Sequence, residues 1–170
     1  MKTSSVRLAV LICLTVFAPM AIGITTPLIT QTCKLQPADQ QLCIDSLSQV
    51  PESEHADVKG LAKIMVDVVL RNHVLETKNK LTDLKKQLPG DQDRLQKCLG
   101  YYDVIGSDIE RTVNNFIPFH EYEAAKQSME DVNYQAMNCV ILYTRPPCPV
   151  EAENKMDMRL ASLAAGIVVL

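Results

Sequence analysis

Residues 96–113 read QKCLGYYDVIGSDIERTV, and this stretch decides how the chain folds. Apolar side chains recur in it every three or four residues, the spacing that gathers them on one face of an α-helix. The pattern continues on both sides and predicts a helix over residues 91–117, ended by Pro118. The predicted buried face of this helix consists of Leu95, Cys98, Tyr102, Ile105, Ile109, Val113 and Phe116.

A second helix with the same spacing is predicted over residues 119–143. Helices joined by a short loop usually pack antiparallel, so the start of the first lies beside the end of the second. Cys98 is near that start and Cys139 is near that end. We therefore expect a Cys98–Cys139 disulfide that clamps two core helices. The second buried face consists of Tyr122, Ala125, Met129, Val132, Ala136, Cys139 and Tyr143.

Two further long helices are predicted, one over residues 56–88 and one over about 150–170. Pro89-Gly90 ends the first of them. Its expected apolar stripe is Val58, Leu61, Met65, Val68, Leu75, Leu81, Leu84 and Leu88. The second carries Met156, Leu160, Leu163 and Ile167 on one face. No alternating strand pattern is found, so the predicted fold class is all-α.

The segment before these helices, residues 26–50, predicts two short helices with a turn near Pro37. Pro37 suits the first turn of the second helix. Cys33 and Cys43 bracket the turn. A disulfide between them would staple a small hairpin that has too little apolar area to hold itself together.

Residues 1–23 have the features of a secretory signal peptide. Lys2 and Arg7 precede the short apolar run LAVLICLTVFA, and small residues follow at a cleavage site after Gly23. The alternative, a membrane anchor, needs roughly 20 apolar residues, which this run does not reach. Cleavage would take the net charge from −3 to −5. This acidic balance argues against a nucleic-acid partner.

Secretion into an oxidising compartment makes disulfides the expected state of the cysteines. Of six cysteines, Cys13 would leave with the signal peptide, so five remain and one has no partner within the chain. Prolines flank Cys148 in the stretch TRPPCPVEAEN and predict an exposed loop. We expect Cys148 to carry a free thiol or to join two copies into a homodimer.

The uncharged end LASLAAGIVVL has two interpretations, a lipid-anchor signal or an apolar helix docked in a bundle. The polar spacer of an anchor signal is missing, which favours the docked helix and no membrane contact after signal cleavage.

Catalytic patterns are not found. His55, His73 and His120 have no zinc-site spacing, and there is no nucleophile elbow or phosphate loop. Acidic pairs such as Asp91 and Asp93 lie at helix starts, where the helix dipole explains them. The expectation is a binding protein with no cofactor and no metal rather than an enzyme.

Several motifs together resemble the plant invertase inhibitor and pectin methylesterase inhibitor family over nearly the whole chain after residue 23. They include T-C-x9-C-x2-S-L from Thr32 to Leu47, ADVKGLAKIMVDVVL (56–70) and KCLGYYDVIGSDIE (97–110). Tyr122 precedes Cys139 as an aromatic residue does in relatives. The ending P-V-x-x-E-N-K (149–155), before an apolar helix, is also similar.

The resemblance implies an antiparallel four-helix bundle (about 55–170) with an N-terminal helical hairpin (about 26–52) and the disulfides Cys33–Cys43 and Cys98–Cys139. It also implies a secreted inhibitor of the apoplast or cell wall, or of the vacuole. Its partner would be a pectin methylesterase or an acid invertase whose substrate cleft it covers. The second hypothesis is a family member that binds without inhibiting, such as a storage or allergen-like protein.

One departure from the family bears on the target. Invertase inhibitors carry a Pro-Lys-Phe loop, where this chain has His120-Glu121-Tyr122. A glutamate is repelled by the acidic residues of a glycosidase site, which favours pectin methylesterase. The expected target contacts are Pro118, His120, Glu121 and Tyr122. A polar ladder at four-residue spacing is a weaker candidate: Lys59, Lys63, Asp67 and Arg71.

Overall fold

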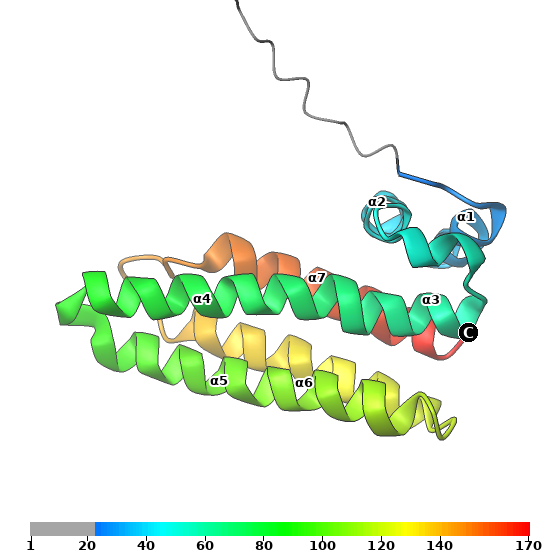
Figure 1. Ribbon diagram of the computed structural model, residues 1–170. Coiled ribbons are helices and arrows are strands. Elements are labelled where there is room, and N and C mark those ends of the chain that lie inside the picture. Colours follow the sequence, from blue (N-terminus) through cyan, green and yellow to red (C-terminus); the bar gives the residue numbers. More distant parts are fainter. Residues whose placement is uncertain (1–22) are drawn as a thin grey trace, which may run out of the picture.

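The computed structural model describes residues 23–170 and is all-helical over that range. Cys13 and, except for Gly23, the predicted signal peptide lie outside the described residues. The N-terminal hairpin consists of α1 (Pro27–Lys34) and α2 (Gln40–Ser48). The turn η1 (Pro51–His55) leads from the hairpin into the bundle. In Figure 1 the hairpin sits at one end of a long bundle.

The bundle contains four long helical segments, two of which include π-helical turns. The first comprises α3 (Val58–Ile64), the π-turn η2 (Met65–Leu70) and α4 (Arg71–Gln87). After the short turn η3 (Pro89–Asp91), the second comprises α5 (Gln92–Arg111) and the π-turn η4 (Thr112–Phe116). The third is α6 (Tyr122–Ile141) and the fourth is α7 (Glu151–Val168). The predicted four-helix bundle with its helical hairpin is confirmed (Figure 1).

Both expected disulfides are present. Cys98 and Cys139 join the start of α5 to the end of α6, with Cα atoms 4.8 Å apart and both residues fully buried. Cys33 and Cys43 join α1 to α2 across the hairpin turn, with Cα atoms 5.6 Å apart. Pro37 lies in this turn, and α2 begins three residues later than its position suggested, at Gln40.

The hairpin docks on the bundle through a few specific contacts. Arg159 of α7 donates hydrogen bonds from its guanidinium group to Asp39, the residue before α2, with 2.7 Å between Nε and Oδ1. Gln36 lies so close to Gly166 of α7 that a Cβ atom there would come within 2.3 Å of the Gln36 side chain. A glycine at residue 166 therefore lets the hairpin approach α7 closely.

The predicted apolar stripe of the first long helix is wrong in part. Leu75 is 49% exposed and Leu88 is 40% exposed, whereas Val66, Leu70 and Val74 are buried instead. The π-turn η2 explains the error at Leu75, because its wider turn replaces a step of four residues by a step of five. Leu88 lies beyond the end of α4.

The expectation of an exposed Cys148 is also wrong. Cys148 is a free cysteine that is only 6% exposed, although prolines flank it. Its sulfur lies 3.7 Å from the Nδ2 atom of Asn154 in α7. Burial raises the pKa of the Cys148 thiol. Both its inaccessibility and its protonation disfavour a disulfide with a second copy.

The C-terminal helix is docked in the bundle, as the spacing predicted. Its buried residues include Leu160, Leu163, Ala164 and Ile167. Within residues 23–170, no helix combines the length and apolar character needed to cross a lipid bilayer.

Thr112, in the π-turn η4, provides a test of the core. Its side chain is fully buried, and its Oγ1 atom has no hydrogen-bond partner among the described residues. We expect Thr112→Val to raise the free energy of unfolding by about 1 kcal/mol, because it removes an unsatisfied buried hydroxyl at nearly constant volume. Urea denaturation measures this change. Thr112→Ser keeps the hydroxyl and loses a methyl group, so it should destabilise; a stabilised Ser variant would contradict the explanation.

Candidate target-binding end of the bundle

The loop between η4 and α6 forms a rigid turn at one end of the bundle. The backbone N–H of Glu121 donates to the carbonyl of Phe116 over 2.8 Å, and that of His120 donates to the carbonyl of Ile117 over 3.2 Å. This pair of hydrogen bonds is the Schellman arrangement that closes many helices. His120 occupies the left-handed position with φ 62°, where glycine is usual. The turn therefore holds a strained backbone, a feature that often marks functional sites.

Side-chain contacts fix the loop to two other elements. The His120 Nδ1 atom lies 2.6 Å from the hydroxyl oxygen of Tyr122, the first residue of α6. The Lys59 ammonium group of α3 lies 5.1 Å from the centroid of the Tyr122 ring. This is a cation–π geometry. Lys59, His120 and Tyr122, predicted from two separate segments, thus come together in one site.

A small apolar pocket of about 120 Å³ lies beside Tyr122. Its walls come from the start of α3, the loop and the C-terminal end of the chain. The lining residues are Val58, Lys59, Ala62, Ile117, Tyr122, Ile167, Val168, Val169 and Leu170. The pocket is smaller than the roughly 300–1,000 Å³ of a typical small-molecule site.

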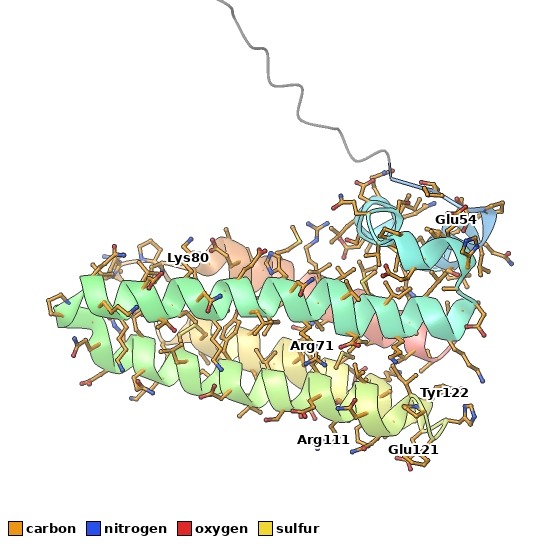
Figure 2. All side chains as sticks on the ribbon, in the orientation of Figure 1. Glu54, Arg71, Lys80, Arg111, Glu121 and Tyr122 are labelled. Atoms are coloured by element: carbon orange, nitrogen blue, oxygen red, sulfur yellow. A yellow bond between two sulfur atoms is a disulfide. The ribbon has the colours of Figure 1, made fainter. Side chains whose placement is uncertain are left out.

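Exposed groups on this end include one that sequence reasoning missed. Phe119, in the middle of the loop, is 71% exposed. Pro118 and Glu121 are also exposed, and Figure 2 shows Glu121 and Tyr122 at the end of the bundle. An aromatic ring next to a helix-ending proline was the available signal for Phe119. An exposed aromatic ring on a rigid turn is suited to bind a partner without catalysing a reaction.

The polar ladder does not form one continuous surface. Lys59 contacts Tyr122, Lys63 is exposed, and Asp67 forms an ion pair of 2.8 Å with Arg71. Figure 2 places Arg71 near the middle of the bundle, away from Glu121 and Tyr122. Only Lys59 therefore belongs to the site at the bundle end. A role for Lys63, Asp67 and Arg71 in target binding stays a prediction.

Sequence reasoning also missed an exposed apolar row on α6. Tyr134, Met137 and Ile141 are exposed and follow the spacing i, i+3, i+7, so they share the outward face of the helix. The Cys98–Cys139 disulfide beneath fixes this part of α6 against α5. The signal in the sequence was apolar residues at positions outside the predicted core stripe.

No three His, Cys, Asp or Glu side chains between residues 23 and 170 could together hold a metal ion. The end of the bundle thus combines a strained turn, an exposed aromatic ring and a small apolar pocket.

Comparison with known proteins gives the evolutionary context of this surface. Residues 27–141 match the sequence model of a family described as plant invertase/pectin methylesterase inhibitor. The chain belongs to this inhibitor family. The match includes the hairpin, both disulfides and the loop from Pro118 to Tyr122.

Individual relatives and a solved structure are similar to this chain. The chain is 27% identical to pectinesterase inhibitor 8 of Oryza sativa subsp. japonica over 138 residues, covering 78% of this chain and 74% of the relative. It is 30% identical to cell wall / vacuolar inhibitor of fructosidase 1 of Arabidopsis thaliana over 87 residues, or 51% of this chain and 42% of that one. The crystal structure of a pectin methylesterase inhibitor from Arabidopsis thaliana has the same fold, with a TM-score of 0.60 at 15% identity, covering 84% and 94% of the two chains.

Proposed function

We propose that this chain is a secreted inhibitor that binds a plant pectin methylesterase and covers its substrate cleft. The observation that carries the proposal is the similarity to a pectinesterase inhibitor over 78% of the chain, together with membership of the inhibitor family. The cell wall is the proposed location, with the vacuole as the alternative. Signal cleavage after Gly23 is part of the proposal.

Inhibition of this kind needs a surface rather than a reaction. Association costs free energy for every loop and side chain that becomes ordered at the interface. The two hydrogen bonds of the Schellman turn and the contacts of Tyr122 with His120 and Lys59 order the loop before any partner arrives. Phe119 is then the proposed anchor, because exposed aromatic residues dominate binding energy at interfaces.

The outward row of α6 is a second proposed contact area. Tyr134, Met137 and Ile141 present exposed apolar atoms on a helix that the Cys98–Cys139 disulfide holds in place. An interface of standard size buries about 800 Å² on each partner, more than a five-residue loop provides. A partner that reaches both the loop and α6 would meet this requirement.

Charge at the loop favours pectin methylesterase over invertase as the target. Glu121 is exposed where a Pro-Lys-Phe loop would carry a cation, and a carboxylate is repelled by the acidic residues of a glycosidase cleft. The same departure supports the second candidate function, a family member that binds a partner without inhibiting an enzyme.

The test is a titration of the oxidised, secreted protein into a pectin methylesterase and, separately, into an acid invertase at mildly acidic pH. We expect stoichiometric loss of pectin methylesterase activity only. Phe119→Ala should weaken inhibition by about 10-fold to 100-fold, as truncation of an interface anchor does. Leu35→Ala changes another exposed apolar residue, at the end of α1 in the hairpin, and is the matched control that should leave inhibition unchanged.

The other outcomes are equally informative. Inhibition of invertase alone would show that the assigned target is wrong. Activity of both enzymes in the presence of folded, disulfide-bonded protein would favour the non-inhibitory alternative. Equal effects of Phe119→Ala and Leu35→Ala would remove the loop from the interface.

A further inference from the structure

The seam between α4 and α7 is closed by polar contacts on successive turns. The residues that make these contacts on α4 are His73, Thr77 and Lys80. Their partners on α7 are Asp157 and Glu153. The His73 Nδ1 atom lies 2.6 Å from Asp157 Oδ1, and the Thr77 hydroxyl donates to Asp157 Oδ2 over 3.0 Å. One turn further along, Lys80 pairs with Glu153. The seam is therefore centred on one carboxyl group of α7.

Asp157 is fully buried and receives a third hydrogen bond from another helix. The Tyr102 hydroxyl of α5 donates to Asp157 Oδ2 over 2.6 Å. Thr77 and Tyr102 are neutral, so His73 is the only group in direct contact with Asp157, among the described residues, that gains a positive charge. A buried carboxylate needs such a partner, because an isolated charge in the interior is costly.

His73 connects this buried carboxyl group to solvent. Its side chain is 27% exposed and lines a groove between α2 and α4. Protons can therefore reach the imidazole ring without unfolding of the bundle, while Asp157 stays covered. This combination of a buried anion and an accessible titratable cation is the basis of a pH-dependent contact.

We propose that His73 and Asp157 form a pH-operated latch, which holds α4 against α7 while His73 is protonated and loosens when His73 becomes neutral. The latch goes beyond inhibition of a target enzyme, because it acts on the chain alone and needs no partner. The bundle is therefore most stable under mildly acidic conditions and less stable above neutral pH.

The acidic side chains around His73 favour its protonated form, in which the latch is closed. Asp157 and Glu153 face it from α7, Glu76 lies on its own helix, and Asp45 of α2 lines the same groove. The nearest cation of the seam, Lys80, is engaged by Glu153. The hydrogen bond to Asp157 raises the pKa of His73, partial burial opposes this, and the charges of Asp157, Glu76 and Glu153 raise it further, so that the pKa lies above 6.5.

The sign of the pH effect follows from this direction. A histidine whose pKa is higher in the folded chain than in the unfolded chain binds more protons when folded. Its stabilising contribution is complete below about pH 6.5 and is lost as the pH rises through the folded pKa. Each pH unit between the two pKa values corresponds to a roughly tenfold change in the ratio of folded to unfolded protein.

The test measures the urea midpoint of the secreted protein between pH 5.5 and pH 8.5. We expect the midpoint to fall as the pH rises above 6.5. His73→Gln keeps a hydrogen-bond donor but does not titrate, so its midpoint should stay constant over this range. His55→Gln changes an exposed histidine in η1 and should keep the fall seen in the unaltered protein.

A second measurement keeps the proposal testable if His73→Gln does not fold. NMR titration of the unaltered protein should show the His73 imidazole changing protonation above pH 6.5, and Asp157→Asn should move this titration to lower pH. A His73 titration at or below pH 6.5, a constant midpoint in the unaltered protein, or a midpoint of His73→Gln that still falls would each overturn the latch. These readouts use no target enzyme, so their outcome is separate from that of the inhibition assay.

Discussion

Replacing both Cys98 and Cys139 by alanine is expected to lower the free energy of unfolding by about 4 kcal/mol. The bond closes a loop with a sequence separation of 41 residues, and a cross-link of that span restricts the unfolded chain by roughly this amount. Both sulfurs are fully buried between α5 and α6, so their removal also takes packing atoms from the core. Urea denaturation without reducing agent measures the loss.

The hairpin disulfide is the matched control for this prediction. Cys33–Cys43 spans only 10 residues, so the corresponding double alanine variant should lose less, about 3 kcal/mol. Its loss should be concentrated in α1 and α2, which have few other contacts with the bundle. If the hairpin variant were the less stable of the two, the order given by loop length would be wrong. A rigid bundle also matters for the proposed function, because α6 and the loop before it carry the expected contacts.

The helices of the bundle could be predicted because their apolar residues repeat without interruption. In α5 and α6 the spacing identified the buried faces and, through the antiparallel arrangement, the Cys98–Cys139 pair. The same method failed in the first long helix at the π-turn η2. A five-residue step cannot be recognised when Val66, Val68, Val69 and Leu70 supply apolar residues at every phase. Leu75 was therefore assigned to the wrong face.

Polar residues in the core were harder to recognise than apolar ones. Asp157 lies in the middle of α7, where a carboxylate is usually solvated. The available signal was its phase, since Asp157, Leu160, Ala161 and Ala164 step by three and four and are all buried. The burial of Cys148 was also not predicted. Prolines indicate a loop, but they do not indicate whether other residues cover it.

The candidate site could be predicted only in part, because it joins residues far apart in the sequence. The loop from Pro118 to Tyr122 was found from the helix break that it causes. The contact of Lys59 with Tyr122 joins the first turns of α3 and α6, which meet only in the folded bundle, so no local pattern reports it. Phe119 was not predicted, because it lies just outside the His120-Glu121-Tyr122 stretch that corresponds to the family loop.

Replacing Asp157 by alanine is expected to lower the free energy of unfolding by about 3 kcal/mol. The change removes the carboxylate acceptor of the buried Thr77 and Tyr102 hydroxyl groups, which keep only the His73 carbonyl and the Asn154 Oδ1 atom as acceptors. It also removes the ion-pair partner of His73. A hydrogen bond to a charged acceptor contributes roughly 1.5–3 kcal/mol, and the remaining neutral acceptors offset part of the loss. His73, which is 27% exposed, reduces its own cost by losing its proton. Urea denaturation at pH 6 gives the value. The loss should become smaller as the pH rises above 6.5, because the raised pKa of His73 makes the unaltered protein lose this charged pair progressively.

A double-mutant cycle with Tyr102→Phe separates the network from simple loss of volume. Tyr102→Phe alone removes the donor and should cost about 1 kcal/mol, because Asp157 still accepts hydrogen bonds from His73 and Thr77. Each single variant loses the Tyr102–Asp157 hydrogen bond and the double variant loses it only once, so the combined loss should be smaller than the sum of the single losses by about 1 kcal/mol. Strictly additive losses would show that Tyr102 and Asp157 act independently, in spite of the 2.6 Å between their oxygen atoms. A coupled result would identify Asp157 as the point where α4, α5 and α7 are held together by shared hydrogen bonds rather than by apolar contact alone.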